Sequence, residues 1–324
     1  MARTEAMLSL QDLSVKATKR DLTLVDGVSL SIGAGERMAL VGESGSGKSL
    51  TCMSIINLLA RGLAVSGGSI RWNGEDIAHA SPARMRQLRG REISMIYQEP
   101  LTALNPILSI GTQLGEAARH VRATRADVLS MLDRVGFHQP ERVLRQRPHE
   151  LSGGMRQRAM IAMALLGKPR LLLADEPTTA LDVTVQDQVL KLIYDISVET
   201  GTALLLVSHD LNVVRRIADR VAVMYTGRIV ESGETERVLT APRHPYTDAL
   251  LQSAPSIEAK SSRLTAIPGR VPTPSEWTSG CRFAQRCAFA TDACSVKPAF
   301  TEVDGQAAAC WHTDRLLELK GVAS

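Results

Sequence analysis

The sequence predicts an α/β fold with a mostly parallel β-sheet, and three observations support this prediction. Short apolar runs at residues 38–41, 171–174 and 203–207 are typical of strands that are buried on both faces. Segments with helical character separate these runs, as in proteins that alternate strands and helices. The first run leads directly into a glycine-rich loop and then a helix, which is the local arrangement of a phosphate-binding loop.

The remaining elements extend this core along the chain. Residues 8–15 and 28–32 alternate between apolar and polar side chains, which predicts strands with one exposed face. A helix is expected after the glycine-rich loop, over residues 49–59, and a helical, arginine-rich region over residues 84–166. The last elements predicted are a helix and a final pair of strands, at residues 183–199, 221–224 and 228–231.

The composition changes near residue 241. Seven prolines and four of the five cysteines follow this point. Such a composition favours a loop-rich segment over a continuation of the sheet. We therefore expect a nucleotide-binding domain over residues 7–240, with a helical subdomain at about residues 84–166, and a small loop-rich C-terminal extension over residues 241–324.

The overall composition narrows the class of protein. Aromatic residues make up 3% of the chain, so a surface that stacks nucleic-acid bases has little to build on. A net charge of +4 neither requires nor excludes an anionic partner. The N-terminus lacks the apolar stretch of a secretory signal, and the best candidate for a membrane span, residues 159–174, is too short and is interrupted by charges. We expect a cytoplasmic protein that reaches a membrane only through partner proteins.

The glycine-rich loop matches the phosphate-loop pattern G-x-x-x-x-G-K-[ST] in full. Its glycines allow backbone N–H groups to converge on phosphate oxygens, and the N-terminus of the next helix adds a favourable dipole. Lys48 is expected to reach the β- and γ-phosphates, and the Ser49 hydroxyl to bind Mg²⁺. The residues expected to contact the nucleotide here are Gly42, Ser44, Gly45, Ser46, Gly47, Lys48, Ser49 and Leu50.

The second apolar run ends in two acids, Asp175 and Glu176. The carboxyl end of a parallel strand is where α/β sheets bind their ligands. Asp175 suits the binding of Mg²⁺, and Glu176 suits the activation of an attacking water. Two acids after a strand are more often a solvated helix start when they occur alone. In the same chain as a phosphate loop they indicate a site of nucleotide hydrolysis.

A third motif lies at Ser152, Gly153 and Gly154, followed by a basic and then apolar helix. A serine and small residues at a helix N-terminus are again suited to an anion. This segment resembles the signature motif of the ATP-binding-cassette (ABC) ATPases. The resemblance implies that these three residues contact ATP.

Three further residues stand in motifs that occur in the order of that family. Gln98 resembles the Q-loop glutamine that senses Mg²⁺ and water, Asp182 resembles the D-loop aspartate, and His209 resembles the switch histidine at the γ-phosphate. One departure is visible. Leu22 or Leu24 stands near the place where the family usually has an aromatic residue that stacks on adenine.

The resemblance to ABC ATPases covers about residues 7–240 and implies their fold, a P-loop ATPase core with a helical subdomain and an antiparallel β edge. It further implies that two cassettes enclose two ATP molecules, each between the phosphate loop of one chain and the signature motif of the other. A second cassette subunit, expected to be a paralogue, is therefore an implied partner.

Three segments narrow the family further. Residues 101–106, 177–186 and 242–247 resemble the dipeptide/oligopeptide importer ATPases, and this resemblance spans nearly the whole chain. It implies an ATPase at the cytoplasmic face of the inner or plasma membrane. Its partners are two transmembrane permease subunits and, indirectly, an extracytoplasmic solute-binding protein; nucleic acid is not expected as a partner.

Other functions remain as alternatives. Nickel and glutathione importers share much of the same pattern, so the cargo is the least specific part of the prediction. A soluble cassette protein that acts in DNA repair or on ribosomes is less favoured. Such proteins usually carry two cassettes in one chain or zinc insertions within the cassette, and the sequence shows neither.

The cysteines of the extension form a separate pattern, Cys281, Cys287, Cys294 and Cys310. In a reducing compartment such thiols are more often metal ligands than disulfides. The tight cysteine pair of zinc sites is absent, and four thiolates are the usual ligands of an Fe–S cluster. Some of the importers that the chain resembles bind a [4Fe–4S] cluster through cysteines like these. Zinc and unmetallated thiols remain open, and His312 is expected to be a surface residue.

Overall fold

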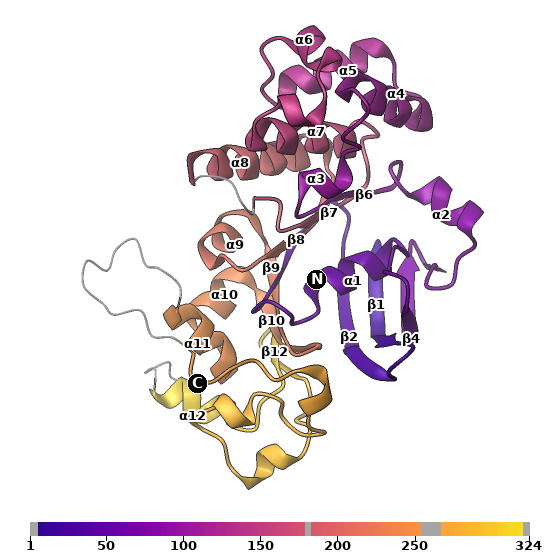
Figure 1. Ribbon diagram of the computed structural model, residues 1–324. Helices are drawn as coiled ribbons and strands as arrows, with labels where there is room; N and C mark the ends of the chain where they lie inside the picture. Colours follow the sequence, from indigo (N-terminus) through magenta and orange to yellow (C-terminus); the bar gives the residue numbers. More distant parts are fainter. Residues whose placement is uncertain (1–5, 179–182, 254–266, 320–324) are drawn as a thin grey trace. The chain divides into compact units, whose positions relative to one another are not determined.

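The computed structural model describes residues 6–178, 183–253 and 267–319 (Figure 1). The chain divides into two compact units. Unit 1 contains residues 32–36 and 79–207, and unit 2 contains residues 6–31, residues 37–78 and the described residues from 208 onwards. Asp182, the expected D-loop aspartate, lies outside the described residues.

Three parallel strands form the centre of unit 1: β6 (Ile93–Ile96), β7 (Leu171–Asp175) and β8 (Ala203–Ser208). β7 lies between the other two and pairs in parallel with both. Every residue of these strands is buried, which explains why two of them are uninterrupted apolar runs in the sequence. β6 corrects the expectation that residues 84–166 are helical throughout. Its four residues are too few for their periodicity to distinguish a strand from a helix.

Helices make up most of the rest of unit 1, as predicted from the sequence. Ser109, Thr124 and Ser152 each stand before a helix and accept a hydrogen bond from a backbone N–H three residues on, which fixes where α4, α5 and α7 begin. Helices α4 to α7 pack against one another (Figure 1). The helices are α2 (Pro82–Leu88), α3 (Pro100–Ala103), α4 (Ile110–Val121), α5 (Arg125–Arg134), α6 (Pro140–Arg145), α7 (Gly153–Leu165) and α8 (Val183–Thr200).

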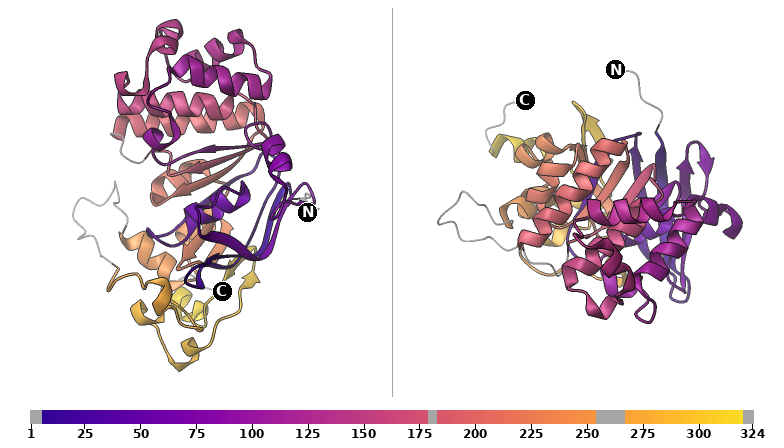
Figure 2. Two further views of the ribbon diagram at one scale, coloured as in Figure 1. Left: turned by 45° about the vertical axis from the view of Figure 1, so that its right-hand side comes forward. Right: turned by 90° about the horizontal axis from the view of Figure 1, so that it is seen from above.

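Unit 2 contains a small sheet formed by the N-terminal part of the chain, in indigo and purple in Figure 2. Its strand order is β2–β1–β4–β5. β4 is antiparallel to both β1 and β5, in agreement with the antiparallel edge implied by the sequence. The pairing of β1 with β4 is interrupted by a bulge between Gln11 and Val15. The strands are β1 (Leu8–Ala17), β2 (Leu22–Ile32), β4 (Leu63–Trp72) and β5 (Glu75–Asp76).

The second sheet of unit 2 starts from β3 (Arg37–Val41), which is parallel to β9 (Arg220–Tyr225). β9 is antiparallel to β10 (Arg228–Glu234) across the turn at Thr226 and Gly227. The extension then adds β12 (Gln306–Ala308) beside β10, and β11 (Thr301–Val303) beside β12. The expectation that the extension does not continue the sheet is therefore wrong. Both added strands are three residues long, which is too short to produce a readable pattern.

Along the chain, four of the helices described for unit 2 lie between strands, and α12 follows the last strand. The helix after the glycine-rich loop ends at Ile55, before the predicted residue 59, and Asn57 has left the helical region with a φ of 50°. Within the described ranges no helix is long and apolar enough to cross a bilayer. The helices are α1 (Lys48–Ile55), α9 (Leu211–Ile217), α10 (Thr235–Thr240), α11 (Pro245–Ser253) and α12 (Thr313–Leu319).

A buried carboxylate, Glu231 of β10, joins the extension to this sheet. It accepts hydrogen bonds from the backbone N–H groups of Arg243 and His244, at 2.6 and 3.0 Å, and from Gln306 Nε2 at 2.7 Å. Glu231 is 0% exposed. Because three donors converge on it, the start of α11 and the strand β12 are held to the same point of β10.

We predict that Glu231→Gln destabilises the protein. The new amide would turn an N–H₂ group toward donors that now bind a carboxylate, and leaving buried donors unsatisfied costs about 1–3 kcal/mol. Thermal unfolding monitored by circular dichroism should therefore show a lower Tm. Glu302→Gln, on the exposed strand β11, is the matched control and should leave the Tm unchanged. Equal Tm values for the two variants would contradict the role given to Glu231.

Candidate functional site

The glycine-rich loop of unit 2 has a backbone that requires glycine. Gly42, Gly45 and Gly47 have φ values of 150°, 79° and 105°. A Cβ at Gly42 would lie 2.1 Å from the Met224 carbonyl oxygen, so no side chain fits there. The loop therefore lies directly against β9 and leads into α1 at Lys48.

Lys48 holds this loop closed. Its ammonium group donates to the carbonyl oxygens of Gly42 and Glu43, at 2.8 and 3.0 Å, and the residue is 4% exposed. The Ser46 N–H donates to the Glu43 carbonyl at 3.2 Å, which closes a turn within the loop. Loops of this shape bind anions through their backbone N–H groups. The structure thus brings Lys48 and the glycines together as the motif predicts.

The mouth of the loop is suited to a phosphate. Ser44 and Gly45 are exposed, and Ser49 is half-buried at the first turn of α1. The Ser46 hydroxyl is buried, and no described residue forms a hydrogen bond with it. The first turn of α1 contains no acid, so nothing in this turn competes for an anion at the helix N-terminus.

Asp175 and Glu176 lie at the carboxyl end of β7 in unit 1. Asp175 is 3% exposed, and Glu176 is half-buried. Glu176 has a φ of 44°, an uncommon backbone conformation for a residue with a side chain, and its N–H donates to the Val207 carbonyl at 3.1 Å. Gln98 follows β6, and its Nε2 donates to Glu176 Oε2 at 3.1 Å. The structure therefore brings Gln98 to the residue expected to activate water.

The signature motif forms the N-terminus of α7. Ser152 caps this helix, with its hydroxyl accepting the Met155 N–H at 3.3 Å. Ser152 and Gly153 are exposed, and a Cβ at Gly153 would have no atom within 4 Å. A Cβ at Gly154 would lie 2.9 Å from Val185, so this glycine is needed where α7 approaches α8. The motif thus presents an open helix N-terminus.

The expected site residues are divided between the two units. Gln98, Asp175, Glu176 and the signature motif belong to unit 1. The phosphate loop and His209 belong to unit 2, where His209 is exposed between β8 and α9. Within each unit these residues lie at strand ends and helix starts.

The four cysteines of the extension are neighbours in unit 2. The Cys281 N–H donates to the Cys294 carbonyl at 2.9 Å. Burial, and to a smaller extent the charges of the other three thiols, raise the pKa of the Cys310 thiol to about 11. Backbone N–H groups point at two of the sulfurs, from Phe289 to Cys287 Sγ and from His312 to Cys310 Sγ, both at 3.3 Å.

The side chains as placed do not form a metal-coordinating group. No three His, Cys, Asp or Glu side chains in the described part of the chain lie close enough together to hold a metal ion. His312, which was expected at the surface, is half-buried. Its Nε2 lies 3.8 Å from Cys294 Sγ and 2.9 Å from Thr291 Oγ1. The sequence separation of 18 residues between His312 and Cys294 gave no sign of this contact.

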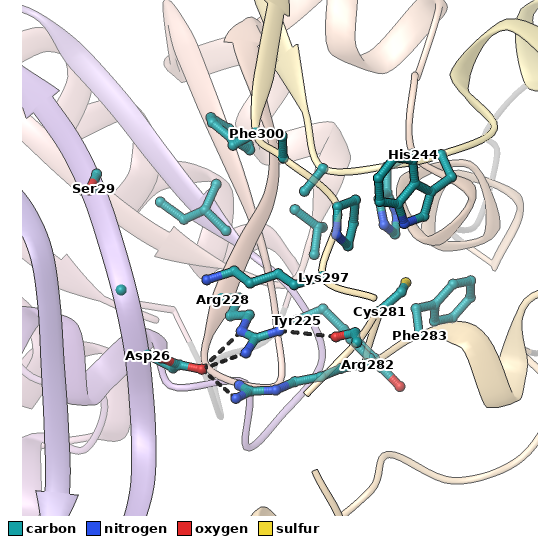
Figure 3. A pocket seen from close by; sticks show the side chains of 18 of the residues that line it. Asp26, Ser29, Tyr225, Arg228, His244, Cys281, Arg282, Phe283, Lys297 and Phe300 are labelled. Carbon is teal, nitrogen blue, oxygen red and sulfur yellow. Dashed lines mark hydrogen bonds and ion pairs between the residues drawn. The ribbon is translucent and has the colours of Figure 1, made fainter. Parts of the chain in front are cut away.

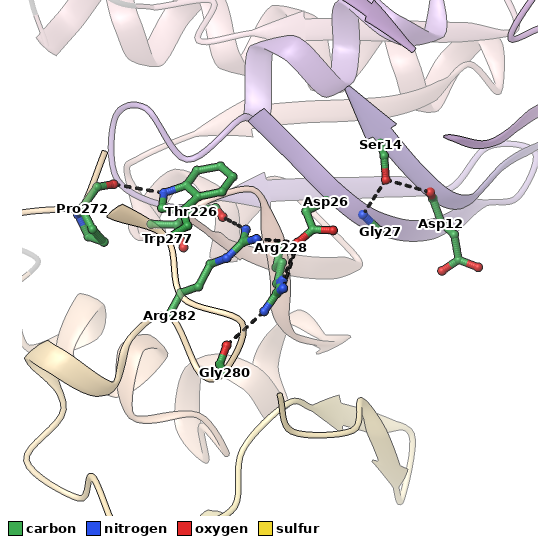
Figure 4. A network of polar contacts seen from close by, with 10 residues as sticks. All are labelled: Asp12, Ser14, Asp26, Gly27, Thr226, Arg228, Pro272, Trp277, Gly280 and Arg282. Atoms are coloured by element: carbon green, nitrogen blue, oxygen red, sulfur yellow. Dashed lines mark hydrogen bonds and ion pairs between the residues drawn. The ribbon is translucent and has the colours of Figure 1, made fainter. Parts of the chain in front are cut away.

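Trp277 of the extension lies at the edge where the sequence lacks an aromatic residue. A Cβ at Gly227 would lie 2.8 Å from the Trp277 ring and 2.9 Å from the Leu24 carbonyl oxygen. The Trp277 indole donates to the Pro272 carbonyl at 3.1 Å, and the Arg282 guanidinium lies 4.1 Å from the ring centroid (Figure 4). Sequence analysis missed this residue because it is remote in the chain from β2.

A cavity of about 470 Å³ lies within unit 2, lined by the small antiparallel sheet, β10 and the extension (Figure 3). Its aromatic walls include Phe283 and Phe300. Arg228 and Arg282 both form ion pairs with Asp26 on one side, at 2.9 and 2.5 Å. Burial alone would raise the pKa of Asp26, but these two guanidinium groups lower it. The Arg282 ion pair joins the extension to β2, and the Arg228 ion pair joins β10 to β2.

Comparisons with known protein families match both parts of the chain. The family model of the ABC transporters matches residues 25–179. The model of the oligopeptide/dipeptide transporter C-terminal region matches residues 230–294.

Two curated relatives cover most of the chain. A probable peptide ABC transporter ATP-binding protein of Sinorhizobium fredii is 47% identical over 302 residues, which is 90% of this chain and 90% of that protein. A putative peptide import ATP-binding protein of Brucella ovis is 49% identical over 292 residues, which is 85% of this chain and 86% of that protein.

Solved cassette structures share the fold. One is a dimeric ATP-binding cassette in a post-hydrolysis state, bound to ADP and Pi; it is 25% identical, with a TM-score of 0.61, over 71% of this chain and 99% of that one. Another is cbiO1 from Clostridium perfringens, part of an ABC transporter complex, with 25% identity and a TM-score of 0.61 over 72% of this chain and 90% of that one. These matches confirm the predicted fold class and the predicted ATPase. The chain belongs to the ABC transporter ATP-binding proteins, in the oligopeptide/dipeptide importer family.

Proposed function

We propose that the protein hydrolyses ATP to power the import of dipeptides or oligopeptides through partner permease subunits. The observation that carries this proposal is the match of residues 230–294 to the C-terminal region of the oligopeptide/dipeptide transporters, because the general cassette match ends before this region. The two relatives described as peptide transporter proteins support the same cargo. In this proposal residues 7–240 form the ATP-hydrolysing domain and residues 241–324 form the extension. The protein is proposed to work at the cytoplasmic face of the membrane.

The phosphate loop is proposed to bind the nucleotide. Its backbone N–H groups, the Ser46 hydroxyl and the N-terminus of α1 are the groups available to phosphate oxygens. Lys48 now binds two loop carbonyls, so its ammonium group is already at the loop and can turn to the β- and γ-phosphates. His209 is proposed to contact the γ-phosphate and Leu50 to lie beside the phosphates.

Ser49, Asp175 and Gln98 are proposed to hold Mg²⁺. The donor set fits this ion, because Mg²⁺ prefers oxygen ligands and keeps several waters. Asp175 is a buried carboxylate at a strand end, and Ser49 follows the loop lysine directly. When bound, Mg²⁺ would neutralise charge on the β- and γ-phosphates.

Glu176 is proposed to act as the general base. It would take a proton from the water that attacks the γ-phosphorus, and the Gln98 amide, 3.1 Å from its carboxylate, would keep this carboxylate oriented. Gln98 stands at the end of β6, so a shift of the following loop would change this contact. A movement of the loop after β6 would therefore change the orientation of the general base, and with it the rate of hydrolysis.

A second cassette is proposed to complete the site. Ser152 and Gly153 are exposed at the N-terminus of α7, which suits a phosphate held by another chain. Gly154 allows the close packing behind them. Asp182 of the D-loop is proposed to contribute to nucleotide binding. We expect the second subunit to be a paralogue.

The permease is proposed to dock beside the loop that follows β6. Ile107, directly after residues 98–106, is 74% exposed, which is high for a large apolar side chain. A short cytoplasmic helix of a permease could cover it, and closure of the cassette dimer would then move that helix. The solute-binding protein would act only through the permeases.

The four cysteines are proposed to hold a [4Fe–4S] cluster. The mutual effects of the thiols on the pKa of Cys310 indicate that they lie near one another, and the two N–H···S contacts are suited to thiolates. The cluster requires Cys281, Cys287, Cys294 and Cys310 to move closer than the structure places them. When bound, such a group would tie four segments of the extension together.

We predict that Glu176→Gln stops ATP turnover and preserves ATP binding. Loss of a general base typically lowers a rate by roughly 100- to 10,000-fold, whereas the amide keeps the shape of the side chain. Phosphate release by the purified complex and uptake of a labelled dipeptide should both fall by that order. Glu141→Gln, an exposed acid of α6, is the control. ATPase activity like that of the wild type in the Glu176 variant would contradict the assignment.

We predict that the protein purified without oxygen contains about four iron and four sulfide per chain, as for a Cys₄-ligated cluster. Cys294→Ser should lose this iron, because a ligand is removed. Cys52→Ala, on α1, is the matched control and should retain it. Iron-free protein, or one zinc ion per chain, would contradict the proposed cluster.

A further inference from the structure

The extension contacts the phosphate loop itself, and both contacts are made to one residue. Glu43 is the second residue of the loop and follows Gly42. Its side chain and its backbone N–H are each bound by a different segment of the extension, one around residue 286 and the other at the start of α11. Glu43 is not among the site residues that were predicted from the sequence.

Arg286 binds the Glu43 carboxylate. Its two terminal nitrogens donate to the two carboxylate oxygens at 2.7 and 3.1 Å, which is the two-point geometry that makes arginine–carboxylate pairs directional. The Arg286 side chain is 5% exposed, and that of Glu43 is 25% exposed, so solvent screens this pair weakly. A further donor of Arg286, Nε, binds the Pro268 carbonyl at 2.8 Å.

Tyr246 binds the backbone of the same residue. Its hydroxyl accepts the Glu43 N–H at 2.8 Å. The Tyr246 ring is fully buried and packs on Tyr225 and Phe283, with centroid distances of 4.5 and 5.4 Å. Because this ring is fixed on several sides, the hydroxyl holds the loop backbone at a defined place.

The contacts continue into the catalytic machinery. Lys48 donates to the carbonyl oxygens of Gly42 and Glu43, so the residue held by Arg286 and Tyr246 is also one that Lys48 binds. At the other end of the loop, the Gly227 N–H donates to the Ser46 carbonyl at 2.8 Å. Arg282 binds the carbonyl of the preceding residue, Thr226 (Figure 4). The extension therefore contacts the loop directly at Glu43, and it contacts Thr226, the neighbour of the residue that binds the other end of the loop.

Arg270, another arginine of the extension, does not contact the loop in this way. Arg270 forms an ion pair with Glu276 inside the extension, with 70% and 40% of the two side chains exposed. That pair touches neither the loop nor the turn after β9 in the contacts that the structure gives it. Arg270 is thus a suitable comparison for Arg286, since it is an arginine of the same segment with an exposed partner.

We propose that Arg286 is a positioning residue for the phosphate loop, and that through it the C-terminal extension sets the affinity of the protein for ATP. This inference rests on the proposal that the loop binds the phosphates of ATP. Arg286 touches neither nucleotide nor water in this scheme. It acts by fixing Glu43, and Glu43 in turn fixes the carbonyls that orient Lys48.

The test is ATP affinity and steady-state kinetics of single and paired variants. Arg286→Gln should raise the KM and Kd for MgATP about 10-fold with little change in kcat, because a loop that must be ordered on binding weakens substrate and transition state alike. Arg286→Lys keeps the charge but not the two-point geometry, so a smaller increase is expected. Arg270→Gln should leave both constants unchanged.

A double-mutant cycle separates positioning from general stability. If Arg286 acts through Glu43, the pair Arg286→Gln and Glu43→Gln should weaken ATP binding no more than either change alone. Additive losses, or a lower Tm with unchanged KM and Kd, would overturn the proposal. Should Arg286→Gln fail to fold, Arg286→Lys and Glu43→Gln give the same comparison.

One further variant distinguishes failure of this inference from failure of the proposed site. Lys48→Ala should abolish MgATP binding if the loop is the phosphate site. ATP binding like that of the wild type in Lys48→Ala would remove the basis of both proposals. Loss of binding in Lys48→Ala, together with unchanged binding in Arg286→Gln and Arg286→Lys, would overturn the positioning role alone.

Discussion

The closed conformation of the phosphate loop is the constraint on which the rest of the site depends. Gly42 lies against the Met224 carbonyl, where no side chain fits, and Lys48 binds two carbonyls of the loop itself. The first of these contacts requires β9 and the loop to stay in place relative to each other. The buried strands β3 and β9, which pair in parallel, provide that rigid support.

The extension takes part in the same support. Tyr246 and Phe283 belong to the apolar core that also contains Val41 and Val223 of the central strands. Glu231 holds the start of α11 and β12 to β10 through three hydrogen bonds. A segment that the sequence describes as loop-rich is thus bound into the sheet and its core, and this attachment explains how its side chains can act on the nucleotide loop.

What the sequence could predict was local. The loop from Gly42 to Ser49, the acids after β7 and the cap at Ser152 are short patterns in which each residue type has its own physical reason, so they can be recognised one at a time. The buried strands were predictable because strands covered on both faces consist of apolar runs. The same local patterns carried the resemblance to the ABC ATPases.

What the sequence could not predict depends on distant pairs. Arg286 and Glu43 are 243 residues apart, and nothing in either neighbourhood indicates that they meet. The contact between His312 and Cys294 could not be predicted either, because it depends on how the extension folds. β12 was missed since three residues carry no periodicity, and β6 since its four residues fit a helix as well as a strand.

The central claim is that this ATPase serves a peptide importer, and reconstitution tests it most directly. ATP hydrolysis would be measured for the protein with its second cassette and permeases in lipid vesicles, with the solute-binding protein either empty or loaded. The account predicts that a binding protein loaded with a di- or oligopeptide stimulates hydrolysis, and that an empty one does not. Stimulation by nickel or glutathione and none by peptides would contradict it.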